Sequence, residues 1–223
     1  MKYAHQCLVT TVSLIAISAM LTVPVPARAG EIHGQQTGHN VSLGNSALAR
    51  NTTGKRNTAL GHGALNRNTT GQKNTAVGTT ALRHNRLGTN NTAVGSGALW
   101  KNYRGSNNTA IGVSALEKNT KGNHNTAVGS EALLKNQTGN SNTASGFRAL
   151  SSNTRGSNNT AVGSEALWKN TQGNSNTALG VQALYRNETG NSNTASGYGA
   201  LSQNTTGNHN TALGSQALNN NIR

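Results

Sequence analysis

The sequence predicts an all-β protein, a parallel β-roll or β-solenoid of eleven 17-residue coils. Three observations lead to this prediction. The consensus N-T-A-[VIL]-G-x-x-A-L-x-x-N-x-x-G-x-x repeats without insertion from residue 40 to residue 223. A 17-residue unit is too short to bury a core alone, so it must stack on its neighbours. Each full copy holds two recurrent glycines and two recurrent asparagines, which disfavour a helical hairpin.

Positions are counted from the first asparagine of each copy, and the coils are numbered in chain order. The eleven coils begin at Asn40, Asn57, Asn74, Asn91, Asn108, Asn125, Asn142, Asn159, Asn176, Asn193 and Asn210. Residues 40–223 therefore form one repeat domain, and residues 30–39 form a short lead segment.

Residues 1–29 have the pattern of a secretory signal peptide. Lys2 precedes the apolar stretch CLVTTVSLIAISAMLTV, and the small residues Ala27 and Ala29 predict cleavage before Gly30. An uncleaved membrane anchor is the alternative, and the prolines that follow the apolar stretch weigh against it. Cys7 lies inside this segment, so disulfides cannot stabilise the mature chain.

Within each coil the sequence predicts two short strands and a turn. Positions 2–5, such as TAVG, indicate the first strand, and positions 8–11, such as ALWK, indicate the second. The N-x-x-G of positions 12–15 is typical of a four-residue turn. The glycine at position 5 fits a tight bend or a close backbone approach that a side chain would block.

Stacked coils turn repetition along the chain into columns of identical side chains. Each residue should lie about 4.8 Å from its counterpart in the next coil, which gives a rod about 50 Å long. The two asparagine columns can then form amide ladders along the stack. Ala at positions 3 and 8, with Leu at position 9, should form a thin core between two sheets.

Position 4 is apolar in most coils and should point away from the Ala column, because side chains alternate along a strand. An exposed apolar stripe of this length favours a homotrimer interface. The alternative is the reverse assignment, with position 4 inside a monomeric solenoid. The predicted interface consists of Leu43, Leu60, Val77, Val94, Ile111, Val128, Val162, Leu179 and Leu213.

Position 11 is mostly cationic, and three large aromatic residues occupy position 10 beside it. Exposed cations near aromatic rings suit sugars, sulfated glycans or phosphates. The alternative is edge protection, in which lysines keep rods from pairing sideways. The predicted binding column consists of Arg50, Arg67, Trp100, Lys101, Lys118, Lys135, Trp168, Lys169, Tyr185 and Arg186, with His84 in the same column.

The excess of positive charge favours an anionic partner, and the scattered titratable residues argue against an enzyme. The chain has 19 Lys and Arg against five Glu, and it contains no Asp. The two glutamates that share a repeat position, Glu131 and Glu165, should lie two coils and roughly 10 Å apart. We expect no catalytic residue, no metal site and no cofactor, because no nucleophile has a base and no cluster has metal-ligand spacing.

The motif NTAVGxxAL…N…G resembles the YadA-like head repeats of trimeric autotransporter adhesins. The resemblance covers residues 40–223 and concerns the head alone, without that family's heptad stalk or membrane strands. It implies a left-handed parallel β-roll, a homotrimer, and binding to extracellular matrix or host cells. The 17-residue period is somewhat longer than the commonest head repeats of the family.

The expected function is therefore that of a secreted or cell-surface adhesin-like protein that binds matrix, glycan or another anionic surface. No specific nucleic acid and no membrane span in the mature chain are expected. One alternative is a self-assembling or phage-tail-like fibre subunit, since the first coil is only mildly altered and no capping segment is evident. A less favoured alternative is ice binding by the Thr column at position 2.

Overall fold

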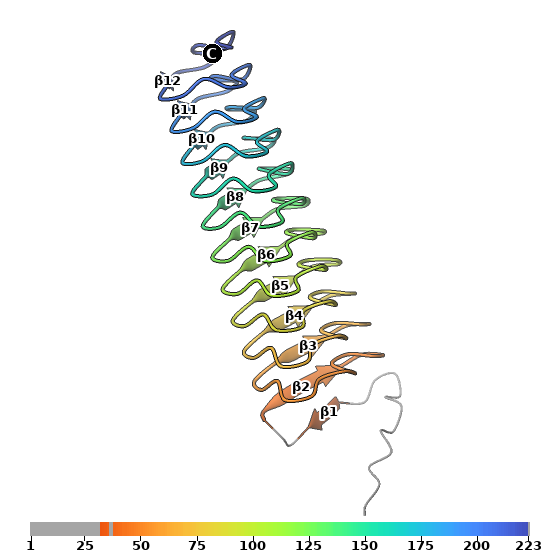
Figure 1. The fold of residues 1–223 in the computed structure, drawn as a ribbon. Helices are drawn as coiled ribbons and strands as arrows, with labels where there is room; N and C mark the ends of the chain where they lie inside the picture. The colour runs from red at the N-terminus through yellow and green to blue at the C-terminus, as the bar shows by residue number, and fades with distance from the viewer. Residues whose placement is uncertain (1–31, 36–37, 223) are drawn as a thin grey trace, which may run out of the picture.

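The computed structural model describes residues 32–35 and 38–222, which form a rod of stacked coils (Figure 1). The predicted parallel β-solenoid is confirmed: β2 to β12 are eleven parallel strands, one per coil, in a single 12-stranded sheet that follows chain order. The predicted signal peptide lies outside the described residues. The strands are β1 (Ile32–Gln35), β2 (Asn40–Leu43), β3 (Thr58–Leu60), β4 (Thr75–Val77), β5 (Thr92–Val94), β6 (Thr109–Ile111), β7 (Thr126–Val128), β8 (Thr143–Ser145), β9 (Thr160–Val162), β10 (Thr177–Leu179), β11 (Thr194–Ser196) and β12 (Thr211–Leu213).

The coils stack in vertical registry. Thr109 of β6 pairs with Thr126 of β7, and Ala110 pairs with Ala127. The other neighbouring parallel strands pair in the same register, one repeat apart in sequence. The prediction that repetition becomes columns in space is therefore correct.

Each three-residue strand alternates between the core and the surface. Ala110 is fully buried, whereas its neighbour Ile111 is 42% exposed. The same alternation recurs from β5 to β7, because the sheet covers the core on one face only. The inward Ala column is confirmed, and the reverse assignment with position 4 inside is wrong.

The second predicted strand, at positions 8–11, is absent from the described coils, where this segment forms turns. The reason lies at position 9, where every Leu has a positive φ between 48° and 53°. That backbone conformation is unfavourable for a leucine. It is held because the side chain is buried and the amide bonds the next coil, as Leu116 N donates to Ala132 O at 2.9 Å. The core thus lies between one sheet and a layer of stacked turns, not between two sheets.

Two buried asparagine ladders run along the rod, as the sequence predicts. At position 1, the Asn125 side-chain oxygen accepts bonds from the Asn142 main-chain N at 3.0 Å and Nδ2 at 3.1 Å. At position 12, Asn136 Nδ2 donates to Asn119 Oδ1 at 2.8 Å. Both ladders also close their own coil, since Asn125 Nδ2 and Asn136 Nδ2 donate to the carbonyl of Gly139. The predicted N-x-x-G turn is therefore fastened by side-chain amides.

The glycine at position 5 allows the close backbone approach that the sequence predicts. A Cβ built on Gly95 would lie 2.5 Å from the carbonyl oxygen of Gly112 in the next coil. Gly95 also has a φ of 132°, a conformation that disfavours a side chain.

The N-terminal end of the sheet differs from the prediction. The lead segment contributes β1, which pairs antiparallel with β2 through Ile32 and Leu43. The run of parallel pairing therefore ends at β2, at an end of the sheet where the sequence showed no evident capping segment. The sequence signal was weak because β1 lies outside the repeat and shares none of its letters.

Candidate functional site

The predicted basic residues form one column on the surface of the turns. In coils 1 to 10 the amide of the position 11 residue donates to the position 10 carbonyl of the next coil, as Lys101 N does to Glu117 O at 2.8 Å and Lys169 N to Tyr185 O at 3.0 Å. Their side chains are exposed or half-buried. Like charges one coil apart repel, so the column should attract anions in a salt-dependent way.

Aromatic rings and cations contact each other at two places in this column, and we call each of these groups an aromatic centre. In coils 8 and 9, Trp168 stacks on Tyr185 with ring centroids 5.1 Å apart and an angle of 20° between the planes. Lys169 Nζ lies 5.6 Å from the Trp168 ring centroid, within cation–π range. Both rings are half-buried, so each leaves part of its surface available to solvent.

The second centre, in coils 3 and 4, is built around His84. The His84 ring makes an edge contact with Trp100 at 5.2 Å, and Lys101 Nζ lies 5.0 Å from the same Trp ring. His84 Nδ1 lies 3.5 Å from an Arg67 guanidinium nitrogen. Partial burial, followed by the charges of Arg67, Arg83 and Lys101, lowers the pKa of His84, so the ring is neutral at pH 7.

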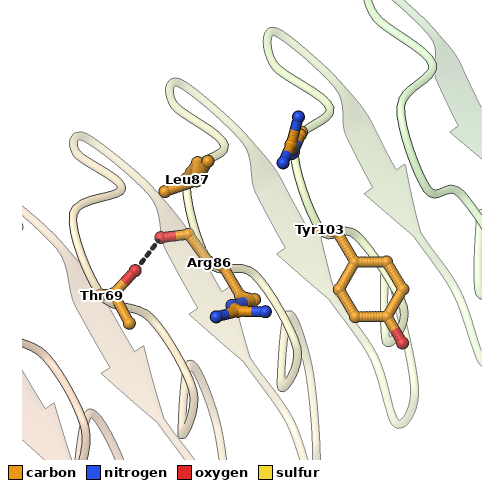
Figure 2. A pocket seen from close by; sticks show the side chains of 5 residues that line it. Thr69, Arg86, Leu87 and Tyr103 are labelled. Atoms are coloured by element: carbon orange, nitrogen blue, oxygen red, sulfur yellow. Dashed lines mark hydrogen bonds between the residues drawn. The ribbon is translucent and has the colours of Figure 1, made fainter.

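A surface hollow of about 310 Å³ lies beside this second centre. Its lining comes from positions 13 and 14 of coils 2, 3 and 4: Thr69, Arg86, Leu87, Tyr103 and Arg104. Figure 2 shows the Arg86 and Tyr103 side chains extending in the same direction from successive coils, while Thr69 Oγ1 donates to the Arg86 carbonyl at 2.8 Å. Tyr103 also makes an edge contact with His84 at 6.1 Å, which joins the hollow to the Trp100 centre.

Sequence reasoning missed the hollow, although a signal existed. Thr is the commonest residue at positions 13 and 14, and each of coils 1, 2 and 5 to 10 carries at least one, whereas coils 3 and 4 carry Arg-Leu and Tyr-Arg there. That local departure from the repeat marks the site.

Charge is distributed unevenly along the rod. Residues 40–116 contain no acidic residue, and every Glu of the described coils lies at or after residue 117. The cations of the acid-free part are Arg50, Lys55, Arg56, Arg67, Lys73, Arg83, Arg86, Lys101 and Arg104. The hollow therefore lies within a purely positive stretch.

The two glutamates that share a repeat position belong to a polar ladder at position 7. Arg148 lies in the coil between them and pairs with Glu131 at 2.7 Å, which raises the pKa of Arg148. Gln182 Nε2 donates to Glu165 at 3.0 Å. Both carboxylates thus have partners within the stack.

The predicted interface residues at position 4 line one edge of the sheet's outer face. Val94 is 37% exposed and Ile111 is 42% exposed, so an apolar stripe follows the strands. In the two coils where position 4 is Ser, position 6 is aromatic and exposed, as Phe147 and Tyr198. These two rings lie outside the predicted interface and widen the apolar surface.

Over residues 32–35 and 38–222, no three His, Cys, Asp or Glu side chains gather in a way that could hold a metal ion. In the same part of the chain, no helix has the length and apolarity needed to cross a membrane. Comparison with protein-family models, with curated proteins and with solved structures finds no match.

Proposed function

We propose that this protein is a secreted or cell-surface rod that assembles as a homotrimer and binds anionic glycan or matrix, in the manner of an adhesin head. The observation that supports this proposal best is the pair of exposed columns on one stack. An apolar stripe and a basic–aromatic column follow the same coils on different faces. One column would assemble the rods, and the other would stay free to bind.

Self-association is supported by the exposed apolar area. Soluble monomers rarely leave a long stripe of Val, Leu and Ile in water, and here Ser145 and Ser196 are its only polar members. Because β2 to β12 keep one register, the stripe on one rod is regular and can pack against identical copies. The resemblance of the repeat to trimeric adhesin heads points to three copies.

A glycan or matrix ligand is supported by the chemistry of the column. Lys101 and Lys169 each lie against a Trp ring, and sugars bind by combining such ring faces with hydrogen-bonding cations. A rigid rod repeats these groups at regular spacing, which suits a polymer ligand.

A crossed experiment with two variants tests this function. The column variant replaces Trp100, Lys101, Trp168 and Lys169 with Ser, the residues that coil 7 carries at the same two positions. We expect it to keep the trimer mass and to lose about tenfold in affinity for a heparin-coated surface, because two aromatic–cation centres are removed. The stripe variant replaces Ile111 and Val128 with Lys. It should fall to monomer mass in light scattering, because both side chains are exposed in the single rod.

Each arm of the experiment can contradict the proposal. Unchanged heparin binding by the column variant would indicate that these lysines serve to keep rods from pairing sideways and do not bind a ligand. A wild-type chain with monomer mass would contradict the trimer, and growing filaments would favour the fibre alternative instead. Replacement of Thr138 and Gln172 with Lys adds the same charge at exposed sites away from the stripe, and this control should keep the wild-type mass.

A further inference from the structure

We propose that the hollow lined by Thr69, Arg86, Leu87, Tyr103 and Arg104 binds a single acidic sugar residue, a hexose-sized ring that carries a sulfate or carboxylate group. This inference rests on the proposed glycan-binding function and assigns it a discrete site. The site differs from the position 10 and 11 column, because its lining comes from positions 13 and 14, which follow the buried asparagine at position 12.

The charge around the hollow fits an anion. Arg86 and Arg104 belong to its lining, and Arg67, Arg83 and Lys101 surround the adjacent His84. A planar guanidinium can hold a sulfate or carboxylate through two parallel hydrogen bonds. Coils 2 to 4, which line the hollow, contain no acidic residue, and Glu117 of the next coil is not part of the lining.

The apolar part of the hollow fits the carbon face of a sugar. Leu87 is 45% exposed and Tyr103 is 37% exposed, so both present apolar surface to solvent within the same lining as the arginines. Figure 2 shows the Tyr103 ring standing next to the Arg86 side chain, so a bound ring could contact both. The volume, about 310 Å³, lies at the lower end of small-ligand sites and suits one ring.

A sugar fits better than a nucleic acid because of how the aromatic rings are arranged. Single-stranded nucleic acids use successive exposed rings on which neighbouring bases stack. Here the Trp100 ring is half-buried and engaged by His84 and Lys101, and Tyr103 is the one aromatic ring that lines the hollow. One ring face with two arginines matches a single acidic sugar unit.

The test uses residues that the repeat itself carries. Thr occurs at positions 13 and 14 in several coils, so Arg86→Thr with Arg104→Thr returns two coils toward the consensus and should fold normally. The matched control is Lys121→Thr with Arg155→Thr, which removes the same charge from exposed position 14 residues outside the hollow. Affinity of the full chain for a heparin tetrasaccharide is measured at one ionic strength by calorimetry. A thymidine oligonucleotide of equal charge serves as the competing probe.

We expect the hollow variant to bind the tetrasaccharide at least about tenfold more weakly, and the control to stay within about twofold of wild type. Equal losses in the two variants would mean diffuse attraction to the rod and would overturn the discrete site, although the proposed function would survive. If the wild-type chain binds neither the tetrasaccharide nor long heparin, the proposed function fails as well. The assignment to a sugar would be overturned if the oligonucleotide bound as tightly as the tetrasaccharide and if the hollow variant weakened both ligands to the same extent.

A second readout places the ligand on the rod. The chain has two Trp, so Trp168→Leu leaves Trp100 alone and Trp100→Leu leaves Trp168 alone. Because His84 contacts both Trp100 and Tyr103, filling the hollow should change Trp100 fluorescence. A response of Trp168 with a silent Trp100 would place the tetrasaccharide at coils 8 and 9 and would contradict the proposal.

Discussion

Replacing Gly95 with Ala is expected to cost about 4 kcal/mol of stability. The new Cβ would lie 2.5 Å from the Gly112 carbonyl oxygen and 2.7 Å from its carbon, so coils 4 and 5 would have to separate. The φ of 132° adds backbone strain. Since a repeat protein is stabilised by contacts between neighbouring coils, amides of coils 4 and 5 should lose hydrogen-exchange protection first.

Gly97 provides the matched control within the same coil. Its φ is also positive, at 69°, but an added Cβ would meet only Ser114, with Oγ at 3.4 Å and Cα at 4.0 Å. Ser, Thr, Glu, Arg and Gln occupy the same position in other coils. Gly97→Ala should therefore change stability by less than about 1 kcal/mol. A similar urea midpoint for the two variants would contradict the close approach at position 5.

Replacing Asn125 with Ala is expected to cost about 3 kcal/mol. The substitution removes the acceptor of the buried Asn142 amide and one of the two donors to Gly139 O. In the unfolded chain the Asn142 amide bonds to water, but in the folded variant it would be buried with no partner. The free-energy cost of such an unsatisfied group exceeds the net contribution of an ordinary hydrogen bond. Urea unfolding followed by circular dichroism measures the loss.

An exposed asparagine offers the matched control for this ladder. Asn140 Oδ1 accepts the main-chain N–H of Asn123 at 2.8 Å, but on the surface, where water can replace it. Ser157 already fills the same role one coil later, accepting from Asn140 N at 3.0 Å. Asn140→Ser should cost less than about 0.5 kcal/mol. If Asn125→Ala lowered stability as little as Asn140→Ser, the buried ladder would not explain why position 1 is always asparagine.

Much of the fold follows from the sequence because the residue at a given repeat position makes the same contact with the neighbouring coil in every copy. Gly recurs at position 5 because the backbone of the next coil passes close to it, as at Gly95. Asn recurs at position 1 because its side-chain amide makes four hydrogen bonds, as at Asn125. Ala recurs at position 3 because the core is thin, as at Ala110. Because side chains alternate along a strand, a buried Ala at position 3 then predicts that position 4 of β6 faces water. Such positions can be interpreted from one chain, since the chain holds many copies of the same environment.

The remainder depended on features that repetition does not reveal. Leu116 and its equivalents look like strand residues, but their positive φ is enforced by burial and by bonds to the next coil. β1 belongs to no repeat, so its pairing with β2 had no pattern to indicate it. The hollow required knowing that Arg86 and Tyr103, from different coils, turn their side chains to the same side.

Vertical registry of the coils is the central claim, and distances between spin labels test it most directly. Cys7 is changed to Ser, and labelled Cys pairs are placed at Lys121 and Thr206, Thr70 and Gln172, or Thr70 and Thr206, which are exposed and occupy one repeat position. These pairs lie five, six and eight coils apart. At roughly 4.8 Å per coil we expect narrow distributions near 24, 29 and 38 Å. Broad distributions, or distances that do not grow in proportion to the number of coils, would contradict the registry.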